Sequence, residues 1–140
     1  MRPATSFMSL TSKSAVLVLF SLLPTLAVQA SDFSGTWKGA YDCDEITRQI
    51  RLELVASGGN VYSGMVSFSA GDELGQFAVR GATSPDAETI IVEPSGWIDR
   101  PEGYAMVGFK ARIHDDVMFG TMSNDRCGAI YVSRLVPPGK

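Results

Sequence analysis

The chain has 140 residues, of which 45% are hydrophobic and 19% are charged, and its formal net charge at pH 7 is −3. This length allows a single domain. The excess of acidic residues argues against nucleic acid as a partner, because binding to phosphates needs clustered Lys and Arg.

The first thirty residues have the pattern of a secretory signal peptide. Two basic residues and no acid precede an apolar run at 15–23, which is too short to span a bilayer comfortably and is broken by Pro24. Small side chains then occupy the two positions that a signal peptidase reads within residues 28–30. We expect cleavage before Ser31, and a retained membrane anchor is the alternative.

Removal of residues 1–30 would leave a folded domain at 31–136 and a disordered tail at 137–140, where two prolines cannot continue a strand ladder. The predicted location of the mature chain is the periplasm or the cell exterior, with no stable membrane insertion after the leader is cleaved. In an oxidising compartment Cys43 and Cys127, the only two cysteines, are expected to form a structural disulfide. Because it would close a loop over most of the mature chain, it should contribute about 4–5 kcal/mol at most.

Eight strands are predicted from apolar residues that alternate with polar ones, the period of a half-buried β-strand. Turn residues separate these segments, most clearly Ser-Gly-Gly-Asn at 57–60, and Pro94 ends the fifth segment. No helical period is found in the mature chain. The predicted strands cover residues 33–42, 48–55, 61–69, 75–82, 88–93, 104–113, 117–123 and 129–135.

Short antiparallel strands joined by short loops predict a single all-β domain, an up-and-down barrel of about eight strands whose interior is filled by side chains. An open β-sandwich is the alternative. In a closed barrel the end of the first strand, which carries Cys43, lies opposite the start of the eighth, near Cys127. The disulfide therefore favours the barrel, with its first and last strands joined.

Gly35 and Trp37, in a Gly-Thr-Trp motif on the first predicted strand, and Arg134 on the last resemble the signature of the calycin superfamily, which includes lipocalins and avidin-like barrels. The resemblance implies that Arg134 packs across Trp37 near the closed end of a barrel. The residues of the avidin biotin pocket are not matched, so biotin binding is not implied. A longer resemblance, over residues 37–43 and 94–104, is to a small exported bacterial β-domain family of unknown function.

The contact between Trp37 and Arg134 depends on strand register. Uninterrupted pairing of Cys43 with Cys127 sets Trp37 opposite Ser133, which places Arg134 on the other face of the sheet. The contact therefore requires a bulge, or a disulfide at the frayed end of the ladder.

Residues 94–104 form the most distinctive segment, which is long for a loop in so small a domain. Its prolines lower the entropy lost on binding, and its aromatic and Arg side chains are types that dominate interface hot spots or stack on sugars. The candidate binding residues are Trp97, Asp99, Arg100 and Tyr104.

A structural interpretation of the same segment is also open. Trp97 would then plug one end of the barrel, while Asp99 would pair with Arg100 or Arg126 and fix the loop in place.

No catalytic residue, metal site or cofactor is predicted. The single histidine, His114, lies in a predicted turn, and a second histidine for a ligand set is missing from the sequence. Carboxylates in predicted loops are interpreted as solvated charges rather than acid–base pairs. These are Asp42, Asp44, Glu45, Asp72, Glu73, Asp115 and Asp116.

The sequence thus favours an exported, non-enzymatic binding module that recognises an unidentified protein, peptide or envelope glycan through loops at one end of the barrel. One alternative is a small-molecule carrier, which requires an apolar internal cavity of several hundred Å³ in place of a filled core. The other is an inhibitor of an extracellular hydrolase.

Overall fold

The computed structural model describes residues 3, 14–24 and 32–135. The predicted cleavage site at 28–30 and the predicted tail at 137–140 lie outside the described residues. Residues 14–24 form neither helix nor strand, and their large apolar side chains are exposed. Within the described ranges, no helix combines the length and the hydropathy needed to span a bilayer.

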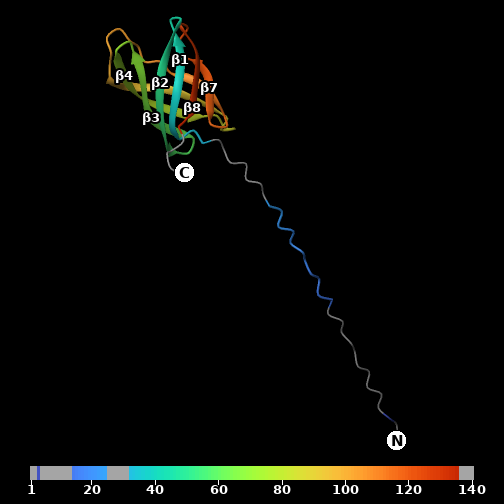
Figure 1. Ribbon diagram of the computed structural model, residues 1–140. Helices are drawn as coiled ribbons and strands as arrows, with labels where there is room; N and C mark the ends of the chain where they lie inside the picture. The colour runs from blue at the N-terminus through green and yellow to red at the C-terminus, as the bar shows by residue number, and fades with distance from the viewer. Residues whose placement is uncertain (1–2, 4–13, 25–31, 136–140) are drawn as a thin grey trace.

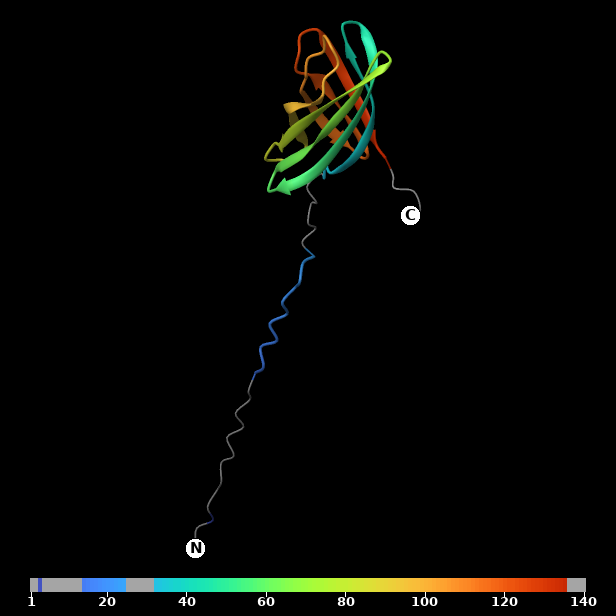
Figure 2. The same ribbon diagram turned by 90° about the vertical axis from the view of Figure 1, so that its left-hand side faces the viewer.

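Eight antiparallel strands form one closed barrel, in which each strand pairs with the next and the last pairs with the first (Figure 1). Figure 2 shows that the strands are tilted relative to the barrel axis, as closure of a sheet into a barrel requires. The predicted barrel is confirmed, and the open sandwich is excluded. The strands are β1 (Gly35–Cys43), β2 (Ile46–Gly58), β3 (Val61–Ala70), β4 (Glu73–Thr83), β5 (Thr89–Asp99), β6 (Phe109–His114), β7 (Val117–Met122) and β8 (Cys127–Arg134).

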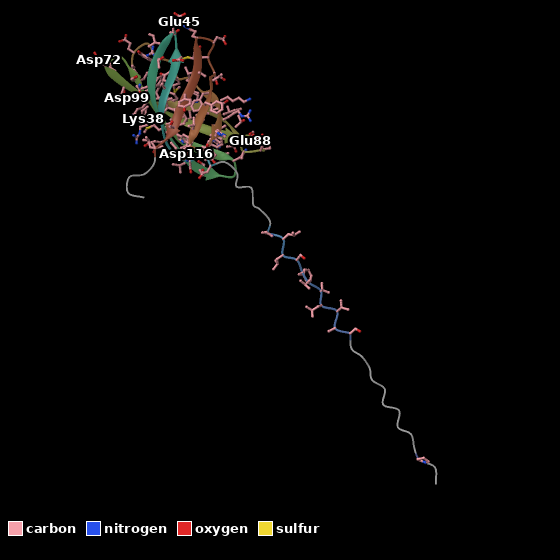
Figure 3. The ribbon with its side chains drawn as sticks, turned by 45° about the vertical axis from the view of Figure 1, so that its right-hand side comes forward. Lys38, Glu45, Asp72, Glu88, Asp99 and Asp116 are labelled. Carbon is pink, nitrogen blue, oxygen red and sulfur yellow. A yellow bond between two sulfur atoms is a disulfide. The ribbon has the colours of Figure 1, made fainter. Side chains whose placement is uncertain are left out.

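The two ends of the barrel carry different connections. We call the end with the β1–β2, β3–β4, β5–β6 and β7–β8 connections the open end, and the opposite end the closed end. Figure 3 shows Glu45 and Asp72 at the open end and Asp116 at the closed end. The connection to which a loop residue belongs therefore tells at which end of the barrel it lies.

Aromatic side chains fill the closed end. Phe33 and Trp37 are both 0% exposed, and the Trp37 indole Nε1 donates a hydrogen bond to the Phe33 carbonyl oxygen at 3.0 Å. The Phe33 ring meets the Tyr62 ring edge-on, with centroids 6.1 Å apart. Full burial of groups this large is a main source of stability in so small a domain.

Arg134 covers this aromatic cluster. Its guanidinium carbon lies 4.2 Å from the centroid of the Trp37 ring, which is the contact that the calycin resemblance implies. The same guanidinium donates hydrogen bonds to the carbonyl oxygen of Ser34, to that of Asp32 at 2.7 Å and to the Asp116 carboxylate at 3.1 Å. Arg134 therefore covers the closed end of the barrel, and its guanidinium is hydrogen-bonded within the fold.

A bulge in β8 makes that contact possible. The β1–β8 register shifts between the pair Tyr41 with Ile130 and the pair Cys43 with Cys127, so that β8 carries one extra residue there. The shift places Arg134 directly opposite Trp37. The predicted disulfide between Cys43 and Cys127 is present and joins the two strands beside the bulge.

The predicted boundaries of the fifth and sixth strands are wrong. β5 continues through Pro94 to Asp99, paired with β4 across two register shifts. Its pairing with β6 ends at the pair Val92 with Phe109. Pro94 lies beyond this pair, where no hydrogen bond to β6 requires the backbone N–H that proline lacks. β6 correspondingly begins at Phe109 rather than at Tyr104. Beyond this point the two strands separate, and residues 100–108 form the connection between them.

Candidate functional site

A cavity of about 400 Å³ lies inside the open end of the barrel. The prediction of a filled interior therefore holds at the closed end and is wrong at the open end. The separation of β5 and β6 accounts for the difference, because the wall there is completed by the 100–108 connection instead of a paired strand. Strands held by a ladder are about 4.8 Å apart, whereas a loop leaves a wider opening.

The walls of the cavity combine apolar and polar side chains. The Phe68 ring packs against Phe77 and Tyr104, with centroid separations of 6.0 and 5.8 Å. These distances are typical of aromatic contact, so the wall is already packed before any ligand enters. The aliphatic and phenylalanine side chains that line the cavity are Ile50, Val66, Phe68, Phe77, Ala105, Val107, Phe109 and Met122.

Arg48 brings a positive charge to this cavity. It lies on β2 at the period of two that also places Ile50 and Leu52 inside the barrel, and it is half-buried. Its Nη1 donates a hydrogen bond to the Tyr104 hydroxyl at 2.9 Å, and its guanidinium carbon lies 5.0 Å from the centroid of the Tyr104 ring. Arg48 forms no ion pair with a carboxylate in the part of the chain that the structure describes.

A second arginine at the cavity does have an acidic partner. The Arg126 Nε lies 2.7 Å from the Asp44 carboxylate, and the Asp44 backbone N–H donates to the Arg126 carbonyl oxygen at 2.8 Å. Beside this pair lies the disulfide of Cys43 and Cys127, which also lines the cavity. The two contacts fasten the β1–β2 and β7–β8 connections to each other at the rim.

Tyr41 adds a hydroxyl to the wall. It lies opposite Arg48 in the β1–β2 ladder and lines the cavity. Burial raises the pKa of the Tyr41 hydroxyl above its ordinary value of about 10, and the positive charge of Arg48 opposes part of that rise. At neutral pH the group is therefore an uncharged hydrogen-bond donor and acceptor.

Of the four predicted binding residues, Tyr104 lines the cavity and the other three do not. Trp97 is half-buried and packs on the same rings that form the wall, with centroids 6.2 Å from Phe68 and 5.7 Å from Phe77. The Arg100 guanidinium carbon lies 5.8 Å from the centroid of Trp97. Trp97 thus packs against the rings that form the cavity wall.

Asp99 is exposed at the end of β5 (Figure 3) and forms no ion pair within the described ranges. The predicted pairing with Arg100 or Arg126 is wrong, because Arg126 pairs with Asp44 and Arg100 lies against Trp97.

The sequence analysis missed Arg48. The signal was present, since the alternation of Ile50, Leu52 and Leu54 extends back by two residues to Arg48 and places it on the inward face. A charged residue in line with the core positions of a strand is unusual and points to a functional or paired group. Arg51, on the outward face of the same strand, has no such significance.

The remaining candidates lie apart from the cavity. His114 is exposed at the closed end, with its Nε2 3.6 Å from the Asp115 carboxylate. Among the described residues, no group of three or more His, Cys, Asp or Glu side chains is placed to hold a metal ion.

No protein-family model matches the chain, and a search of the curated proteins finds no match either. The closed eight-stranded antiparallel barrel is consistent with a calycin-like fold. The geometry of the cavity is therefore the basis on which a function can be assigned.

Proposed function

We propose that the protein binds a small molecule in the open-end cavity and acts as a carrier or receptor rather than as an enzyme. The observation that carries this proposal is the cavity itself. Its volume of about 400 Å³ falls within the range of about 300–1,000 Å³ that is typical of small-molecule sites. Its lining combines apolar side chains with polar groups that could orient a ligand, among them Arg48, Tyr41 and Tyr104.

The architecture supports a preformed site. The closed end is packed with fully buried side chains, and the rim is fastened by a disulfide and by the ion pair between Asp44 and Arg126. A binding site that is rigid before the ligand arrives loses less entropy on binding.

Export and calycin membership are part of the same proposal. Export is supported by the leader pattern and by the disulfide, which is typical of proteins that fold in an oxidising compartment. Membership of the calycin superfamily is supported by the packing of Arg134 on Trp37 at the end of the barrel opposite the cavity. A periplasmic or secreted carrier fits both features.

Calorimetric titration of the mature protein with naphthylacetamide, a compact neutral probe, tests cavity binding. Val107→Phe should weaken binding about tenfold or more, because Val107 lines the cavity and the larger ring would occupy part of it. Val55→Phe is the matched control, since Val55 is 65% exposed on the outer face of β2 and should leave binding unchanged. Equal binding by the two variants would contradict the proposal.

A second candidate function is recognition of a protein, peptide or glycan by the outer surface of the 97–100 segment, which includes inhibition of an extracellular hydrolase. The observation that favours it is Ile98, which is 57% exposed beside the exposed side chains of Asp99 and Arg100. The double substitution Ile98→Ala with Arg100→Ala should then abolish capture of a crosslinked partner from native envelope. Binding of naphthylacetamide should be unaffected, which separates this function from the first.

A further inference from the structure

The charges around the cavity do not cancel. Arg126 is neutralised by Asp44 at 2.7 Å, whereas Arg48 meets a hydroxyl and an aromatic ring and, within the described residues, no carboxylate. The cavity thus holds one positive charge in excess. A charge in a partly desolvated, apolar site is costly unless a counter-charge approaches it, so this arrangement favours an anion.

The donors of Arg48 are only partly used. A guanidinium carries five N–H donors, and the Tyr104 hydroxyl oxygen accepts one of them at 2.9 Å. The planar fork of the remaining donors matches the two oxygens of a carboxylate. The Tyr104 ring, whose centroid lies 5.0 Å from the guanidinium carbon, adds a cation–π contact.

Tyrosine hydroxyls in the cavity wall add hydrogen-bond donors to those of Arg48. Because the Tyr104 oxygen accepts its hydrogen bond from Arg48, its own proton remains to be donated. Tyr41, on the neighbouring strand opposite Arg48, contributes a further hydroxyl to the cavity wall. A guanidinium and two hydroxyl groups therefore lie close together above apolar walls that contain Phe68 and Phe109.

We propose that the ligand is a compact amphipathic carboxylate, whose anionic head is bound by Arg48 and Tyr104 and whose apolar body lies against the phenylalanine rings of the cavity. This inference rests on the proposed small-molecule function and specifies the class of ligand. A single excess positive charge suits a monoanion better than a phosphate dianion, which would leave one negative charge uncompensated.

The test compares naphthylacetate with naphthylacetamide, which have nearly the same shape and differ in charge, by calorimetric titration at neutral pH. The unmodified protein should bind the carboxylate about tenfold or more tightly than the amide, because hydrogen bonds to charged groups are the stronger ones. Arg48→Gln should remove this preference, so that the two probes bind with similar affinity. Arg51→Gln, which removes the same charge from the outer face of β2, should keep the preference intact.

A second variant keeps the test decisive if Arg48→Gln does not fold. Tyr104→Phe retains the ring beside the guanidinium and removes only the hydroxyl, so it should lower the preference for the carboxylate over the amide about threefold or more. Equal affinity for the two probes, or a preference that survives both substitutions, would overturn the carboxylate assignment while leaving cavity binding in place. Failure of both probes to bind would overturn the proposed function as well.

Discussion

Two inward-facing arginines serve different purposes in this barrel, and their partners distinguish them. Arg134 is supplied with two backbone carbonyl oxygens, a carboxylate and the face of Trp37. Arg48 has one hydroxyl and the ring that carries it. A cation whose donors are satisfied within the fold stabilises it, whereas a cation with donors to spare is available to a ligand.

Removal of the Arg134 side chain should therefore be costly to the fold. Arg134→Ala would uncover the Trp37 ring and leave carbonyl oxygens near the closed end without a donor, so we expect a loss of about 2–4 kcal/mol in the free energy of unfolding. Urea denaturation followed by tryptophan fluorescence measures this loss in the free energy of unfolding.

Arg112→Ala provides the comparison, because Arg112 forms an exposed ion pair with Glu88 at 3.3 Å. Such pairs contribute at most about 1 kcal/mol. Similar losses for the two variants would show that Arg134 has no special role at the closed end.

At the level of single residues, one member of the proposed anion-binding pair could be identified from the sequence. Tyr104 was found because it lies in a segment rich in residue types that bind ligands. Arg48 was missed because its importance comes from facing inward, and the first residue of a predicted strand is the one whose direction is least certain. The alternation along β2 indicates an inward position for Arg48, and the pairing of Arg48 with Tyr41 in the β1–β2 ladder establishes it.

At the level of elements, β1 depends on a close approach to β8. A Cβ atom on Gly39 would lie 2.0 Å from the Tyr131 carbonyl oxygen and 2.8 Å from the Val132 Cα, both of which belong to the β8 backbone. The glycine is therefore required by the spacing of the two strands that close the barrel, not by an unusual backbone angle.

Gly39→Ala should force β1 and β8 apart and lower the free energy of unfolding by about 3 kcal/mol or more. Gly96→Ala on β5 is the matched control, because a Cβ there meets no atom within 4 Å. That variant should be neutral or gain up to about 1 kcal/mol from the reduced entropy of the unfolded chain. Chemical denaturation of both proteins gives the values, and a harmless Gly39→Ala would rule out the tight β1–β8 contact.

The course of β5 could not be predicted from its own residues. Pro94 is a sound reason to end a strand that is paired on both sides, yet β5 at this point is paired only with β4. Whether a proline is tolerated thus depends on where the neighbouring strand ends, which is a property of β6. The same separation of β5 from β6 opens the cavity, so the error in the strand boundary and the missed cavity have one cause.

For the molecule as a whole, the closed architecture followed from the sequence, because period-two alternation, turn residues and the positions of Cys43 and Cys127 all indicate the same barrel. The cavity at the open end did not follow from the sequence. Composition and periodicity determine which residues face inward, whereas the space left between them depends on the distances between strands.

The disulfide should be a major part of global stability in so small a domain. Replacement of Cys43 and Cys127 by Ser removes a link between positions 84 residues apart, and we expect the free energy of unfolding to fall by about 2–5 kcal/mol. Urea denaturation followed by circular dichroism, with the oxidised parent chain as the reference, measures this loss. A change below about 1 kcal/mol would mean that the barrel closes without help from the link.

The central claim is that the open end of the barrel is a ligand site. The most direct measurement is a titration of the isotopically labelled mature domain with naphthylacetate, followed by amide chemical shifts. We expect saturable shifts at residues that line the cavity, such as Ile50, Phe68 and Val107, and none at the closed-end turns around Gly59 and Asp115. Shifts spread evenly over both ends, or confined to the outer surface of the barrel, would contradict the claim.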